Sequence, residues 1–94
     1  MVIETFASVD AARAVYARFR ERGRMAPEGL TYVQSWTEEA LCRCYQVMEA
    51  DPTQADALFA AWTANWDDLV AFTIVPVITG AEAAARLLGG EPTA

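Results

Sequence analysis

The apolar pattern of this chain changes its period several times along the sequence, in an order that few folds share. Strand-like alternation occurs at residues 1–6, 30–36, 41–50 and 70–78, and helical spacing occurs at residues 9–22 and 52–66. The order β-α-β-β-α-β is the ferredoxin-like pattern, an α+β fold with an antiparallel sheet. In that topology both helices cover one face of the sheet, and the first strand lies between the third and the fourth.

Capping signals support these boundaries. Ser8 and Asp51 stand where N-caps of the two helices are expected, and Thr79 with Glu82 opens an extra short C-terminal helix. We therefore expect a ferredoxin-like domain over residues 1–79, followed by a short helix and a frayed tail over residues 80–94.

The fourth strand contains Pro76, which cannot donate a hydrogen bond to a β-ladder. Prolines are confined to edge strands and bulges. The strand is therefore expected at the edge of the sheet, or with a bulge at the proline.

Composition limits where the protein acts and what it binds. The chain has 94 residues, of which 54% are apolar, and this predicts one globular domain. No apolar run reaches the roughly 20 residues of a membrane span. Glu4 interrupts any secretory pattern at the N-terminus, so we expect a cytoplasmic protein with no membrane partner. A net charge of −6 argues against nucleic acid as a partner.

The chain contains neither histidine nor lysine. A Ser-His-Asp triad, imidazole metal ligands and Schiff-base chemistry are therefore excluded. Acid–base chemistry would depend on carboxylates, tyrosine, cysteine or water, and we expect no cofactor. Cys42 and Cys44 are interpreted as small apolar fillers and not as metal ligands, with a site of four thiolates from two chains as the alternative.

The parity of residues along the strands gives the candidate site. The even positions of the first three strands combine large side chains with polar groups, namely Glu4, Phe6, Tyr32, Gln34, Trp36, Cys42, Cys44, Gln46 and Met48. The odd positions are smaller and more aliphatic, so we expect them to pack beneath the helices. The even face would be too polar for a dry core and too apolar for water. We therefore expect a second copy of the chain to cover it.

The prediction is a homodimer whose two sheets enclose a cavity for a small, partly apolar organic molecule. As an enzyme it would be cofactor-independent, with Glu4 as the proton acceptor and with Gln46 and Tyr32 orienting the substrate. The remaining predicted ligand-binding residues are Phe6, Gln34, Trp36 and Met48. The alternative is a non-catalytic dimerisation or regulatory module, in which Glu4 is solvated or pairs with an arginine of the partner.

Two other clusters have simpler interpretations. Trp62 and Trp66 could stack on a ligand, but they continue a helical apolar stripe and are expected in the core. Arg22 and Arg24 could hold an anion, but structural or interface ion pairs are the expectation.

Several separated blocks resemble a known family. They are RERGRMAPEGLTYVQSW, RCYQVME and WTANWDDLVAFTIVPVIT, and together with the first strand they extend to about Thr79. The sequence resembles a bacterial family of small domains, domain-of-unknown-function family 3303. The resemblance implies a ferredoxin-like chain paired as a dimeric α/β barrel, and it implies no activity.

Overall fold

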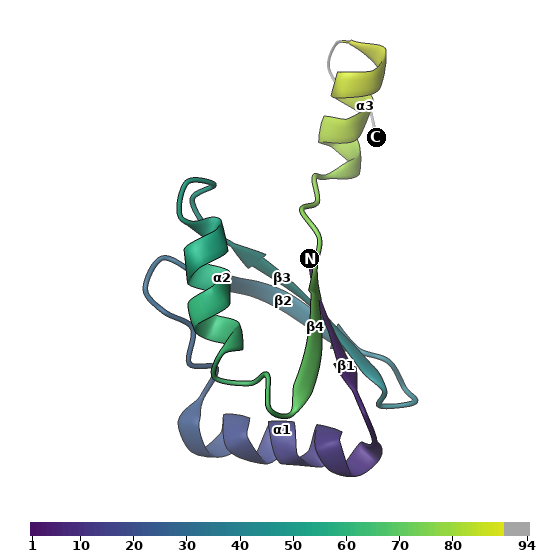
Figure 1. Cartoon of the computed structure of the whole chain (residues 1–94). Helices are drawn as coiled ribbons and strands as arrows, with labels where there is room; N and C mark the ends of the chain where they lie inside the picture. The colour runs from purple at the N-terminus through teal and green to yellow at the C-terminus, as the bar shows by residue number, and fades with distance from the viewer. Residues whose placement is uncertain (90–94) are drawn as a thin grey trace.

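The computed structural model describes residues 1–89 and confirms the predicted α+β, ferredoxin-like fold. Four antiparallel strands form one sheet in the order β2-β3-β1-β4 (Figure 1). The elements are β1 (Val2–Phe6), α1 (Val9–Arg22), β2 (Thr31–Thr37), β3 (Arg43–Glu49), α2 (Ala55–Thr63), β4 (Val70–Ile74) and α3 (Gly80–Leu88). The predicted tail at residues 90–94 lies outside the described part of the chain.

The sheet has the predicted strand neighbours. β1 lies between β3 and β4, and β4 is an edge strand. β4 ends at Ile74, before Pro76, so the ladder never requires a donor from the proline. Beyond the strand, the Val75 N–H donates to the Met1 carbonyl at 2.8 Å.

The helix ends follow local capping chemistry. The Ser8 hydroxyl accepts a hydrogen bond from the Ala11 N–H at 3.1 Å, which satisfies one free donor at the start of α1. The expected cap at Asp51 does not begin α2. Its carboxylate accepts hydrogen bonds from the N–H and the hydroxyl of Thr53, and this holds a separate turn ahead of the helix. The helix itself therefore begins at Ala55.

The assignment of the two sheet faces from the sequence is wrong. The buried positions of the inner strands are even-numbered, namely Val2, Glu4, Phe6, Cys44, Gln46 and Met48, and most belong to one core with Trp62 and Trp66. The even face thus lies beneath the protomer's own helices. The large aromatic side chains of the α2 region, meaning α2 and the turns after it to residue 69, supply enough apolar cover for this bulky face, and a cavity accommodates its polar groups. The odd positions face away from the helices.

A β-bulge at Val33 changes the parity of β2. Tyr32 pairs with Met48, whereas Gln34 pairs with Val47. One extra residue moves all later side chains to the opposite face. Gln34 and Trp36 therefore lie on the outer face, where 54% of Trp36 is exposed.

The C-terminal helix α3 stands apart from the rest of the molecule at the end of an extended segment that continues from β4 (Figure 1). None of its residues is buried, and Leu87 and Leu88 are exposed. The radius of gyration is 15.4 Å, whereas a compact domain of this length has about 12 Å. Within residues 1–89, none of the helices has the length and apolarity needed to cross a membrane.

Candidate functional site

A cavity of about 250 Å³ lies between the sheet and the helical layer of the same protomer. Its lining residues are Glu4, Val15, Tyr16, Phe19, Arg24, Ser35, Cys44, Gln46, Trp62 and Trp66. They come from β1, α1, β2, β3, the loop after α1 and the α2 region. The cavity that Glu4 lines is therefore internal to one chain, and its walls do not require the second sheet that the sequence predicted.

The polar part of the cavity wall is a chain of three side chains. The Gln46 Nε2 donates to Glu4 Oε1 at 2.7 Å, and Arg24 Nη1 donates to Gln46 Oε1 at 2.9 Å. Glu4 and Gln46 are buried, with 6% and 5% of each residue exposed. Because the carboxylate accepts and the guanidinium donates, these two neighbours fix the orientation of the Gln46 amide. The Gln46 amide therefore connects the Glu4 carboxyl group to the Arg24 guanidinium by hydrogen bonds.

Glu4 is poised to exchange a proton near neutral pH. Burial raises the pKa of Glu4 from 4.5 to about 7, because the charged carboxylate loses water. The positive charge of Arg24 and hydrogen bonds from Cys44 and Gln46 oppose this rise in the pKa. Both protonation states are therefore well populated near pH 7, as general acid–base chemistry requires.

Arg24 is held between two aromatic rings. Its guanidinium carbon lies 3.6 Å from the centroid of the Tyr32 ring and 5.1 Å from that of Phe19. Cation–π contact at these distances restrains the guanidinium plane. The Tyr32 hydroxyl is 2.7 Å from the Ser35 hydroxyl, so the bulged strand β2 orients the ring.

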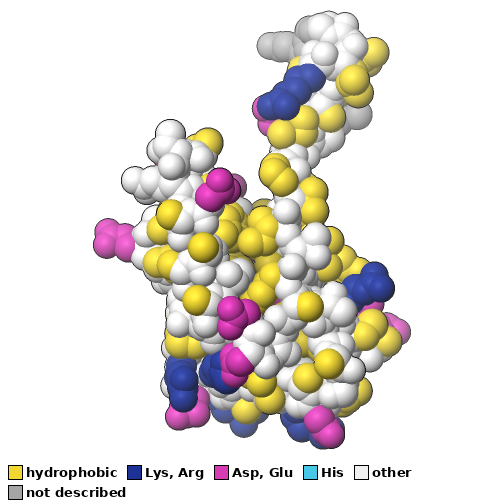
Figure 2. Space-filling view, viewed as in Figure 1, with side chains coloured by type: hydrophobic (Ala, Val, Ile, Leu, Met, Phe, Trp, Pro, Cys, Tyr) yellow, Lys and Arg dark blue, Asp and Glu magenta, His cyan; other side chains and the backbone are white. Residues whose placement is uncertain are grey.

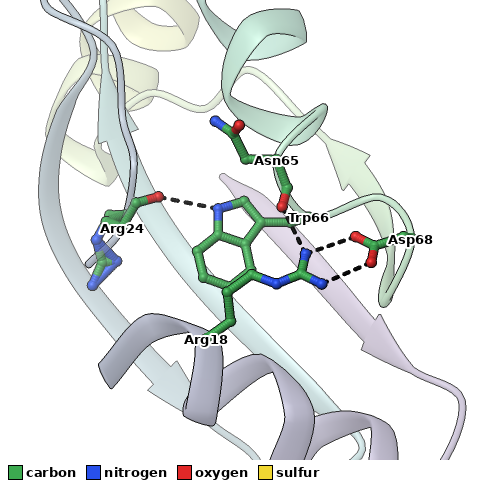
Figure 3. Close-up of polar contacts among 5 residues, drawn as sticks. All are labelled: Arg18, Arg24, Asn65, Trp66 and Asp68. Atoms are coloured by element: carbon green, nitrogen blue, oxygen red, sulfur yellow. Dashed lines mark hydrogen bonds and ion pairs between the residues drawn. The ribbon is translucent and has the colours of Figure 1, made fainter. Parts of the chain in front are cut away.

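Three hydrogen bonds attach the loop after α1 to the α2 region. The indole N–H groups of Trp62 and Trp66 both donate to the Arg24 carbonyl at 3.0 Å, and Figure 3 shows the second of these bonds. The Asn65 Nδ2 donates to the Met25 carbonyl at 3.2 Å. The loop leaves α1 through Gly23, whose φ of +71° is a left-handed conformation that glycine adopts at low cost. The position of the Arg24 backbone is thus set by Trp62 of α2 and by Trp66 in the turns that follow this helix.

A second arginine links α1 to the segment that follows α2. The guanidinium of Arg18 makes two 2.7 Å hydrogen bonds to the carboxylate of Asp68 and one of 2.9 Å to the Asn65 carbonyl (Figure 3). The Arg18 guanidinium also lies 5.8 Å from the Trp66 ring centroid. The hydrogen bond from Arg18 lowers the pKa of Asp68, so the pair stays ionised at neutral pH.

The comparisons with known proteins agree with the motifs in the sequence. The model of a family described as "Domain of unknown function (DUF3303)" matches residues 1–90. The chain belongs to the DUF3303 family. No curated protein and no solved structure matched it. Because the family carries no assigned activity, the chemistry of this DUF3303 chain has to be inferred from the cavity itself.

The DUF3303 chain brings only part of the predicted site together. Glu4 and Gln46 line the cavity and are hydrogen-bonded, as adjacent strands allow. Phe6 and Met48 are core residues on the same face. The other three predicted residues are placed differently: Tyr32 stacks on Arg24, and Gln34 and Trp36 lie on the outer face.

Arg24 and the aromatic wall of the DUF3303 cavity were not among the predicted ligand-binding residues. Trp62 and Trp66 are buried in the core, as expected, but they also line the cavity. The sequence signal for Arg24 was its place directly after the helix-terminating Gly23. That signal fixes where a helix ends, but the direction of the next side chain depends on the loop.

The two thiols of the DUF3303 chain occupy different environments. Cys44 is a core residue, and burial raises the pKa of its thiol. Cys42 is exposed, and its thiol donates to Glu38 Oε1 at 2.9 Å, so it is not a core filler. Residues 1–89 contain no group of three or more Cys, Asp or Glu side chains placed to hold a metal ion.

Proposed function

We propose that this chain binds a small, partly apolar organic molecule in the cavity beneath its own helices, where Glu4 exchanges a proton with it. The observation that carries the proposal is the Glu4–Gln46–Arg24 chain in the cavity wall. A buried carboxyl group with its pKa near neutrality inside a mainly apolar pocket is the arrangement expected of a general acid or base.

The size of the cavity limits the ligand. A volume of about 250 Å³ corresponds to about eight water molecules at ~30 Å³ each. This is below the usual range for drug-sized ligands, so a single ring with one or two substituents is the expected size. As an enzyme the protein would use its own side chains for proton transfer, with Gln46 holding the carboxylate in place.

Binding is tested by a fragment screen with two matched variants. A thermal-shift screen of small aromatic compounds should raise the melting temperature of the wild-type chain. Val15→Phe fills the cavity wall and should abolish the shifts, whereas Val77→Phe, on the exposed segment after β4, should keep them. Equal shifts in both variants would contradict binding in this cavity.

We also propose that the chain forms a homodimer through the outer face of its sheet. The supporting observation is an apolar group on that face, where Trp36, which is 54% exposed, pairs with the half-buried Tyr45 and lies near Ile3 and Val47. A separate group of apolar side chains lies on the helix-bearing side, between α2 and β4 (Figure 2). An exposed apolar group such as the one on the outer face is unusual for a monomer. This surface favours the second candidate function, a dimerisation module without a ligand.

Sedimentation velocity tests the dimer. The wild-type chain should sediment as a species of twice 10.3 kDa at micromolar concentration. Trp36→Glu places a charge on the outer face and should shift the protein to the monomer. A wild-type chain that remains monomeric would contradict the proposal.

A further inference from the structure

The cavity wall places the carboxyl group of Glu4 and the permanently charged guanidinium of Arg24 at the two ends of the Gln46 amide. Glu4 contacts the nitrogen of Gln46, and Arg24 contacts its oxygen. Arg24 uses one of its five N–H donors on Gln46, and the rings of Tyr32 and Phe19 restrain the guanidinium plane. Since Arg24 also lines the cavity, its remaining donors are near the space that a ligand would occupy.

The net charge of the lining depends on one proton. Arg24 is always charged, and Glu4 is the one acidic residue in the lining. With Glu4 protonated the lining carries a charge of +1, and with Glu4 ionised it is neutral. The other groups facing Glu4 are the Cys44 thiol and, from β4, Phe72, while the α2 region contributes two indoles. No second carboxyl group in this lining masks the proton.

We propose that the ligand of this cavity is a small aromatic monocarboxylate, bound by Arg24 while Glu4 is in its neutral form. This inference rests on the proposed function and names its ligand class. The planar guanidinium fork fits a carboxylate, and the neutral Glu4 can donate its O–H to the same ligand group. The aromatic side chains of the lining suit a ring. A cationic ligand would be repelled by Arg24.

Proton coupling gives the proposal a quantitative signature. Burial raises the pKa of Glu4 to about 7. Glu4 is therefore protonated in about nine-tenths of the molecules at pH 6 and in about one-tenth at pH 8. If only the protonated form binds the anion, the affinity falls about tenfold between these pH values. A neutral ligand of the same shape should show no such fall.

The experiment uses three probes of nearly equal shape: benzoate, benzyl alcohol and benzylammonium. Each is titrated into the full chain at pH 6 and pH 8, and the indole N–H resonances of Trp62 and Trp66 report on the cavity. Benzoate should bind most tightly, and about tenfold more weakly at pH 8. Benzyl alcohol should bind more weakly and without dependence on pH.

Three variants assign the charges. Glu4→Gln keeps a neutral hydrogen-bonding group, so benzoate should bind it equally at both pH values. Arg24→Met removes the cation but keeps the carbonyl that the two indoles hold. The affinity of Arg24→Met for benzoate should fall at least tenfold, whereas its affinity for benzyl alcohol should be retained. Arg24→Lys provides a second variant, which keeps the charge and should retain the pH dependence.

The outcomes separate this inference from the proposed function. Benzyl alcohol binding with no preference for benzoate, or tighter binding of benzylammonium, would overturn the carboxylate class and leave the cavity as a ligand site. If none of the probes shifts either indole resonance, the proposed function fails together with the inference.

Discussion

Replacing Glu4 by glutamine tests the electrostatics of the cavity without changing its shape. In the wild-type chain, Glu4 Oε1 accepts a hydrogen bond from Gln46, and the oxygen of a glutamine can accept the same bond. The variant removes only the ionisable group from a residue that is 6% exposed. We expect Glu4→Gln to be more stable than the wild-type protein above pH 7.

The magnitude follows from the pKa of Glu4. Its rise from 4.5 to about 7 means that the folded state binds this proton more tightly than the unfolded state. The stability that the proton supplies is therefore complete below pH 4.5 and lost as the pH rises through 7. At 1.36 kcal/mol per pH unit, the full loss is about 3 kcal/mol, of which about 2.5 kcal/mol falls between pH 5 and pH 8.

Urea denaturation followed by tryptophan fluorescence measures this loss. The free energy of unfolding is determined for both proteins at several pH values from 5 to 8. The other acidic groups are common to both proteins, so their contributions cancel in the difference between variant and wild type. That difference should grow by about 2.5 kcal/mol in favour of Glu4→Gln over this range.

The control is Glu39→Gln, which removes the same charge at an exposed position in the β2–β3 connection. Its difference from the wild type should stay nearly constant with pH. The reasoning would be refuted if Glu4→Gln lost stability at pH 8, because the carboxylate would then be a structural partner of Arg24. A difference that does not vary with pH would refute the raised pKa.

Three further predictions concern the surroundings of the cavity. Trp62→Phe removes a buried indole and its hydrogen bond to the loop after α1, and should lower the free energy of unfolding by about 1–3 kcal/mol in urea denaturation. Asp68→Asn breaks the partly exposed pair with Arg18, and should lower the melting temperature by a few degrees in dilute buffer and by less in 1 M salt. In thiol labelling with a disulfide reagent, Cys42 should react in the native protein and Cys44 only after unfolding, because Cys44 is buried.

The fold could be predicted because it depends on periodicity, which the sequence displays directly. The faces of the sheet could not, because parity shows only which residues share a face and not which face the helices cover. Glu4 made the even face look unsuitable for a core, whereas the structure accommodates it beside a cavity. The bulge at Val33 left no sign in the sequence, and it separated Trp36 from the predicted site.

The candidate site was predictable where it depended on strand neighbours. Glu4 and Gln46 are polar residues in apolar strands, and their contact follows from the pairing of β1 with β3. Arg24 was not predictable in the same way, because its direction depends on loop geometry, with Met25 at a φ of 58°, and on the indoles of Trp62 and Trp66.

The two hydrogen bonds to the Arg24 carbonyl link the indole wall of the cavity to its cation. If Trp62 and Trp66 moved away from the sheet with both bonds intact, the Arg24 backbone would move with them and the guanidinium would leave Gln46 and Glu4. The positive charge that lowers the pKa of Glu4 would then be lost. Widening of the cavity on this side and weaker acidity of Glu4 would therefore occur together.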